Sequence, residues 1–209
     1  MVLTINTPSF PPGHTCFAFP ASEINAHVVI TPLHDEDITD FTVDMRLNFA
    51  KITKDPFYLS VFSNDVYSDH KNDLGIGDRV VIIDEKNYDL PSVKSTARLG
   101  TNHRLTISRK GKYLKMFWDG QQKVGRHVTT HEIRKGASWV LGQEQDTRGG
   151  GFDPTQRFIG TICHFQMWNV GLTKAIAPDF FKNPLSIGKP TVFDNPPNYK
   201  LELKGAIQL

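Results

Sequence analysis

Apolar and polar residues alternate along much of this chain with a period of two. The nine residues 41–49 follow the alternation, and Leu114, Met116 and Trp118 repeat it after a Lys110-Gly111 turn. A period of two is typical of a strand with one buried face, and apolar runs separated by turn dipeptides are typical of hairpins. Strands are therefore predicted at residues 28–30, 41–49, 58–62, 80–83, 105–108, 114–118, 139–141, 158–168 and 199–203.

The stretch 158–168 differs because it has apolar residues at both odd and even positions. We expect the odd-numbered ones, including Cys163 and Phe165, to share one face, and the even-numbered ones, including Ile162, to share the other. Apolar residues on both faces predict a central strand that is covered on both sides.

Helical patterning is scarce. Residues 177–182 are the best candidate, because Pro178 suits a first helical position and Pro184 ends the run. Many short strands with one short helix predict an all-β, two-sheet antiparallel sandwich. A chain of 209 residues without a repeat, a low-complexity tract or a linker fits one domain spanning residues 1–209.

Composition narrows the function classes. The 24 basic and 22 acidic residues give a net charge of +2, which argues against nucleic acid as the main partner. Apolar runs are too short for a transmembrane segment, and the start of the chain shows no leader-like pattern. Two cysteines, Cys16 and Cys163, are too few to staple a small secreted fold, so composition leaves the compartment open.

The strongest candidate for chemistry is a loop that follows the predicted strand 139–141. It carries three carboxylates and two side-chain amides: Glu144, Gln145, Asp146, Asp153 and Gln156. Three successive glycines, 149–151, let its backbone turn sharply. Clustered oxygen donors of this kind suit Ca²⁺, although the order of residues does not match an EF-hand. A solvated acidic loop is the alternative, and composition alone leaves both open.

The residues LGQEQDTRGGGFDPTQRFIG (141–160) and HFQMW (164–168) resemble the most recognisable stretch of the pentraxin family. The likeness extends in collinear order to FAFP (17–20), FTV (41–43), MFWDG (116–120) and YKLELKG (199–205). It covers nearly the whole chain, so it is far more specific than one loop. It implies a jelly-roll-like, concanavalin/pentraxin-like sandwich and a binding protein rather than an enzyme.

The resemblance also implies two adjacent Ca²⁺ ions held by this loop. Glu144 and Asp146 would bridge both ions, Gln145 would offer its backbone carbonyl, and Asp153 and Gln156 would complete the outer site.

Family members supply further ligands from an earlier loop. Asn72 and Asp73 are the expected substitutes here, with Asp69 in reserve. If Lys71 takes the acidic position instead, the inner site loses a carboxylate.

The function implied is Ca²⁺-dependent, lectin-like pattern recognition in innate immunity. The expected partners are phosphocholine-, phosphoethanolamine- or anionic-glycan-type groups on lipids or microbes. They would be bound by a secreted cyclic homo-oligomer, a pentamer or stacked pentamers. Where family members place an apolar wall, this chain has Gly75-Ile76-Gly77 with no bulky aromatic nearby, so the choice of ligand stays open.

Cysteine usage departs from the family. The signature His-x-Cys becomes His103-Arg104-Leu105, and the expected partner position is Asp44, so the family disulfide is absent. Cys16 and Cys163 either form a replacement bond or remain two buried thiols; the sequence favours neither.

The sequence has three alternative interpretations. A laminin-G-like or legume-lectin-like module differs mainly in ligand and oligomer. A glycoside hydrolase on a related sandwich needs a carboxylate pair, and the run from Glu144 lacks the final glutamate of one such family. A zinc site at His127 and His131 is disfavoured, because residues 128–130 favour a strand that would hold the two histidines roughly 13 Å apart.

Overall fold

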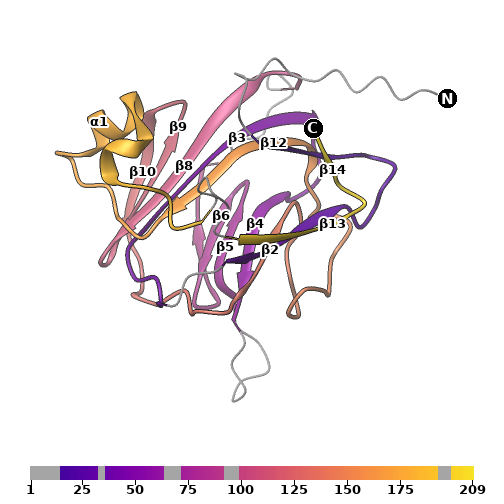
Figure 1. Cartoon of the computed structure of the whole chain (residues 1–209), viewed down its shortest axis with the longest axis horizontal. Coiled ribbons are helices and arrows are strands. Elements are labelled where there is room, and N and C mark those ends of the chain that lie inside the picture. The colour runs from indigo at the N-terminus through magenta and orange to yellow at the C-terminus, as the bar shows by residue number, and fades with distance from the viewer. Residues whose placement is uncertain (1–14, 33–35, 64–71, 92–98, 193–198) are drawn as a thin grey trace.

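A computed structural model of the chain describes residues 15–32, 36–63, 72–91, 99–192 and 199–209. Two antiparallel sheets lie face to face, and one short helix covers part of one of them (Figure 1). The predicted all-β two-sheet sandwich with one short helix is confirmed.

The first sheet has the strand order β10-β9-β8-β3-β12-β1-β14. Its strands are β10 (Gln121–His127), β9 (Tyr113–Trp118), β8 (Asn102–Lys110), β3 (Phe41–Lys51), β12 (Ile159–Trp168), β1 (Cys16–Phe19) and β14 (Ile207–Gln208). The second sheet has the order β13-β2-β11-β4-β5-β6-β7. Its strands are β13 (Tyr199–Lys204), β2 (His27–Pro32), β11 (Ser138–Leu141), β4 (Phe57–Phe62), β5 (Asn72–Gly77), β6 (Val80–Ile83) and β7 (Lys86–Asp89).

The core fills the space between the sheets and includes a cluster of aromatic rings. Phe158 makes edge-to-face contacts with Phe49 and Tyr58, at centroid distances of 5.4 and 5.7 Å. All three rings are buried, and such pairs add to the energy of burial itself. Because Phe158 follows the acidic loop directly, this cluster fixes the end of that loop to both sheets.

Strand β12 lies inside its sheet and is covered on both sides, as predicted. The expected division into odd and even faces is wrong, however, because the register shifts between Cys163 and Gln166. His164, at φ 53°, occupies this bulge. An extra residue reverses the alternation, so Ile162 and Phe165 both face the main core.

The helix α1 (Ala177–Lys182) and the 3₁₀ turn η2 (Pro184–Ile187) follow β12. Phe180 of α1 packs on Trp168 in a second apolar cluster, on the outer side of the first sheet. In the described part of the chain, neither helical element approaches the length needed to cross a bilayer.

Cys16 and Cys163 lie directly opposite each other on β1 and β12 and form a disulfide. This decides between the two alternatives that the sequence left open. The expected pairing of Asp44 with Leu105 is wrong by one residue, since Leu105 lies opposite Met45 and Asp44 opposite Thr106. Asp44 accepts hydrogen bonds from Arg104 Nε at 2.8 Å and from Thr106.

The strand predicted for residues 128–130 is absent, since β10 ends at His127 and the next residues are irregular. His131 instead lies between two carboxylates, with Nε2 2.9 Å from Asp73 and Nδ1 3.3 Å from Asp84. His127 packs its ring on Tyr113. The two histidines therefore have separate partners.

Candidate metal and ligand site

The acidic loop begins where β11 ends, at a glycine whose backbone conformation and surroundings disfavour any side chain. Gly142 has φ 87°, and a Cβ there would lie 2.4 Å from the ring of Phe19. Its N–H donates to the backbone carbonyl of Tyr58 at 3.1 Å, and its own carbonyl accepts from Phe158 N–H at 2.8 Å. These bonds close the base of the loop, so residues 143–157 project from a fixed point.

Gln145 braces the loop from inside. Its side chain is fully buried, and its amide N–H₂ donates to the carbonyl oxygens of Ser60 and Ser138 at 2.9 and 3.2 Å. Its amide oxygen accepts from Gly149 N–H at 2.7 Å. A buried amide with satisfied donors and acceptor fixes the direction of the chain on either side of it. Gln145 therefore positions Glu144 and Asp146, its two neighbours.

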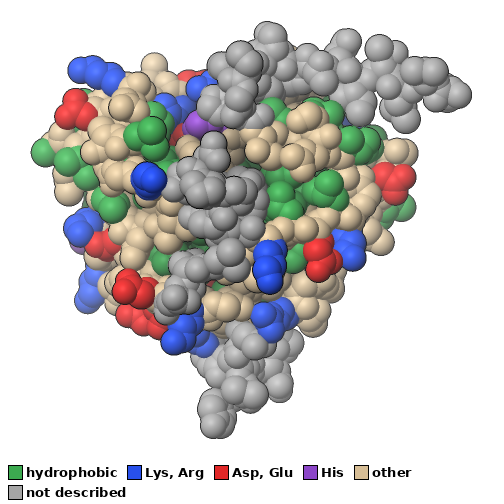
Figure 2. Space-filling view, viewed as in Figure 1, with side chains coloured by type: hydrophobic (Ala, Val, Ile, Leu, Met, Phe, Trp, Pro, Cys, Tyr) green, Lys and Arg blue, Asp and Glu red, His purple; other side chains and the backbone are tan. Residues whose placement is uncertain are grey.

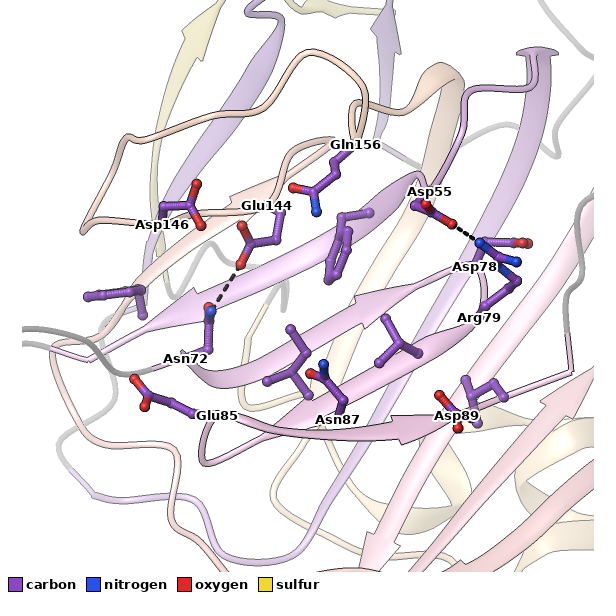
Figure 3. Close-up of a pocket in the computed structure, with 15 residues that line it drawn as sticks. Asp55, Asn72, Asp78, Arg79, Glu85, Asn87, Asp89, Glu144, Asp146 and Gln156 are labelled. Carbon is purple, nitrogen blue, oxygen red and sulfur yellow. Dashed lines mark hydrogen bonds and ion pairs between the residues drawn. The ribbon is translucent and has the colours of Figure 1, made fainter.

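Four oxygen-bearing side chains meet at the edge of one pocket: Asn72, Glu144, Asp146 and Gln156. Figure 3 shows Asn72 on its strand below, facing the other three, which come from the loop. Asn72 Nδ2 donates to Glu144 Oε1 at 2.9 Å. The backbone carbonyl of Gln156 accepts a hydrogen bond from Phe57 N–H at 2.8 Å, which holds this residue against β4.

Glu144 is in an environment that disfavours its charge. The pKa of Glu144 is raised to about 7, chiefly by burial and also by the nearby carboxylates of Asp146 and Asp153, while the hydrogen bond from Asn72 acts in the opposite direction. Its exposed fraction is only 5%. A carboxylate that is both desolvated and close to a like charge is stabilised by a proton or by a cation.

The other predicted ligands lie outside this group of four. Asp153 accepts a hydrogen bond from Thr155 N–H at 2.8 Å, which lowers its pKa, and it does not line the pocket. Asp73 is buried and accepts from His131 and from Arg134 N–H, away from the pocket. Asp69, the reserve ligand, falls outside the described residues, as does Lys71, whose expected place in the inner site is therefore not tested.

The pocket extends from these four residues across the outer face of the second sheet and has a volume of about 870 Å³. Its floor is apolar and includes Phe57, Phe62, Val80 and Ile82. Its far side is formed by β7, whose exposed Asn87 and Asp89 point into it, together with Glu85 (Figure 3). Arg79 forms an ion pair with Asp55 at one end.

Sequence reasoning missed the aromatic part of this floor. Gly77 was expected to leave the pocket without a bulky aromatic, but strand pairing sets Phe57 directly opposite it. A Cβ on Gly77 would lie 3.3 Å from the Phe57 ring. The glycine therefore makes room for an aromatic ring from the neighbouring strand, a contact between distant residues that no local pattern reveals.

The residues present fit Ca²⁺ by chemistry. Two carboxylates and two amide oxygens are hard donors of the type that Ca²⁺ prefers, and backbone carbonyls or waters complete its coordination in other proteins. Among the described residues, no three Asp, Glu, His or Cys side chains converge closely enough to hold a metal by themselves. A site built here therefore depends on amides as well as on Glu144 and Asp146.

Comparison with known proteins gives a consistent result. A sequence profile described as the Pentaxin family matches residues 15–186. Human neuronal pentraxin-1 is 38% identical over 98 residues, which is 44% of this chain and 22% of that protein. Rat serum amyloid P-component is 29% identical over 75% of this chain and 69% of its own length. C-reactive protein of Mesocricetus auratus is 27% identical over 76% of this chain and 72% of its own length.

The fold has close structural counterparts. A native heptameric SAP-like pentraxin from Limulus polyphemus superposes with a TM-score of 0.71 at 16% identity, over 93% of this chain and 94% of that one. A putative carbohydrate-binding protein from Bacteroides ovatus superposes with a TM-score of 0.67 at 12% identity, over 93% of this chain and 59% of that one. At these identities the likeness concerns the fold alone.

Proposed function

Because this chain belongs to the pentraxin family, a family of non-enzymatic binding proteins, we propose that it binds phosphorylated headgroups in a Ca²⁺-dependent manner. The match covers only 22% of the length of human neuronal pentraxin-1. Any activity of a longer protein that contains this chain is therefore also a proposal. The observation that carries it is the convergence of Asn72, Glu144, Asp146 and Gln156 at one end of a single pocket.

Each of these side chains has a defined part in the proposal. Glu144 and Asp146 supply the negative charge that holds the ion, while Asn72 and Gln156 supply neutral oxygens. The Asn72 amide now donates to Glu144, and a turn of this amide about its last side-chain bond would present its oxygen instead. Bound Ca²⁺ supplies open coordination positions that accept phosphate or carboxylate oxygens.

The pocket favours a ligand that carries a positive charge beside its phosphate. Its far side carries Glu85 and Asp89, while Arg79, the one arginine among the described residues that line it, is paired with Asp55. An ammonium group at that side meets negative charge, and its alkyl part meets the apolar floor formed by Phe57 and Ile82. Phosphoethanolamine and phosphocholine carry both a phosphate and a positively charged amine group. A purely anionic glycan carries only the negatively charged group.

Calorimetric titration with Ca²⁺ tests the metal site. Wild-type chain should bind Ca²⁺, and the double variant Glu144→Gln, Asp146→Asn should lose at least tenfold in affinity, since it keeps shape but removes both charges. Asp89→Asn is the matched control: it removes a charge from the same pocket at the opposite side, and it should leave Ca²⁺ affinity within about twofold. Equal Ca²⁺ binding by wild type and the double variant contradicts the proposal.

Ligand class is tested on immobilised phosphoethanolamine, phosphocholine and an anionic glycan, each with and without chelator. We expect the two headgroups to retain the protein only with Ca²⁺, and Asp89→Asn to weaken this retention. Stronger retention on the anionic glycan than on either headgroup would overturn the choice of ligand while leaving the metal site intact.

Membership of the family also supports a proposal about how the chain assembles and where it is located. We propose a secreted protein that forms a cyclic homo-oligomer, with five chains or stacked rings of five as the expected form. The Limulus counterpart is heptameric, so homo-oligomers of this fold are not restricted to five chains.

A further inference from the structure

A second, smaller cleft opens on the other side of strand β7. Along this strand Asn87 and Asp89 face the pocket described above, whereas Lys86 and Tyr88 point to the inner side of the sheet, where they pair with Ile83 and Val81. The cleft has a volume of about 430 Å³ and lies between β7, the turn before β9 and the end of β10. It therefore lies where the edges of the two sheets meet.

The charge of this cleft is opposite to that of the first pocket. Lys86, Lys112 and His127 line it and are exposed. In the described part of the chain, neither lysine takes part in an ion pair. Asp84 is the one acidic side chain among the described residues that line the cleft, and it lies 3.3 Å from His131 Nδ1. Two lysine charges are thus left without a carboxylate partner.

A third cation, the guanidinium of Arg126, lies close by. The guanidinium of Arg126 stacks over the Tyr88 ring at 5.5 Å and donates to the backbone carbonyl of Asp89, so it is held near the cleft by neutral groups. A neutral partner leaves the charge of the arginine available to attract an anion.

The wall of the cleft is rigid and carries hydroxyl groups. Tyr88 Oη donates to Thr129 Oγ1 at 3.0 Å and accepts from Thr129 N–H at 2.8 Å. Val128 N–H donates to the Lys112 carbonyl at 3.0 Å, which ties the lysine-bearing turn to the end of β10. Thr129 Oγ1 accepts from Tyr88, so its own hydroxyl hydrogen can be donated to a ligand.

We propose that this cleft binds a sulfate group carried on a sugar chain, without Ca²⁺. The cations are exposed and stand around an open cleft, a form that suits an anion which stays partly hydrated. Such contacts are individually weak, so a chain with repeated anionic groups binds better than a single small anion. This site is separate from the metal site and does not depend on it.

The test measures binding of the full chain to an immobilised, short sulfated oligosaccharide in the presence of EDTA. Wild type should bind, and its desulfated counterpart should not. Lys86→Gln with Lys112→Gln should weaken binding at least tenfold, and Lys86→Glu with Lys112→Glu should abolish it. Because both lysines are exposed, these variants should keep the wild-type unfolding temperature.

Matched controls distinguish binding at this cleft from non-specific attraction by the net charge of the chain. Lys189→Gln with Lys200→Gln changes net charge by the same amount at exposed positions elsewhere, and it should alter binding less than twofold. Equal weakening by both pairs, unchanged binding by Lys86→Gln with Lys112→Gln, or tighter binding to an oligonucleotide than to the sulfated sugar would each overturn the proposal. Glu144→Gln with Asp146→Asn should bind the sulfated sugar normally, which distinguishes this site from the proposed metal site.

Discussion

The carboxyl group of Glu144 has two possible partners, a proton and a metal ion. It is buried, it lies close to Asp146, and its pKa is raised to about 7. In the absence of metal, the folded chain must either protonate this group or hold it ionised in a poor environment. The unfolded chain has no such restriction, so Glu144 makes folding stability depend on pH.

Glu144→Gln tests this dependence. A folded pKa raised above the unfolded value of 4.5 stabilises the fold fully below pH 4.5, and this contribution is lost as pH rises through about 7. In chelator, the unfolding free energy of wild type should therefore fall by about 2–3 kcal/mol between pH 5 and pH 8 because of Glu144. The variant should not show this fall. Denaturant unfolding at the two pH values measures the difference; identical pH dependence of wild type and variant would contradict it.

Adding Ca²⁺ at pH 8 provides the second half of this experiment. Binding to the folded state alone should raise the stability of wild type and leave Glu144→Gln nearly unchanged.

Asp73 gives a prediction of a different kind, because the sequence suggests a metal ligand and the structure shows a buried anchor. Its carboxylate holds His131 Nε2 at 2.9 Å and Arg134 N–H at 3.0 Å. Asp73→Asn should cost about 1–3 kcal/mol in unfolding free energy and leave the number of Ca²⁺ ions per chain unchanged. Calorimetry that shows one ion fewer, with stability unaltered, would instead assign Asp73 to the metal.

The site could be predicted from sequence only where its residues are close in the chain. Glu144, Asp146 and Gln156 share one loop, and they do line one pocket. Asp73 could not be oriented, because the pairing of β4 with β5 is irregular between Val61 and Phe62 and breaks the usual alternation.

The pocket floor could not be predicted for a related reason. Phe57 reaches the pocket through its pairing with Gly77, and such a register is set by the whole sheet rather than by local sequence.

At the scale of elements, the alternation of apolar and polar residues predicts strands that have one apolar face. It does not predict strands without such a face. Strand β5 contains two glycines and β7 reads Lys-Asn-Tyr-Asp, so neither shows an apolar period. Both are strands because their neighbours in the sheet supply backbone partners. Of these two unpredicted strands, β5 carries Asn72 and β7 forms most of the far side of the proposed ligand pocket.

The disulfide is the strongest link between distant elements and offers a direct test. Cys16 and Cys163 are 147 residues apart, and closing so long a loop restricts the unfolded chain. Replacing both with serine should lower the unfolding free energy by up to about 4–5 kcal/mol. Thiol titration of the denatured, unreduced chain should find no reactive thiol, and two reactive thiols per chain would show that the bond does not form.

For the whole molecule, strand β7 separates two clefts of opposite charge. Glu85 and Asp89 line one, and Lys86 and Lys112 line the other. Charges of both signs are also interspersed over the face seen in Figure 2, in keeping with a net charge of only +2. Selectivity in this chain is therefore expected from local arrangements of charge and not from a global field.

A ring of such chains should bind surfaces far more tightly than it binds dissolved ligand. If every chain holds a headgroup weakly through its metal site, several sites that engage one surface raise the apparent affinity by about 10²–10⁴-fold. Vesicles containing phosphoethanolamine lipid at increasing density provide the surface, and free phosphoethanolamine provides the reference, both in Ca²⁺.

We expect vesicle binding to rise steeply with lipid density and to vanish in chelator, while light scattering gives about five or ten chains per particle. A ring with another number of chains would keep the avidity argument and correct the ring size. A monomeric particle, or an affinity for dense vesicles equal to that for the free headgroup, would show that the chain acts singly.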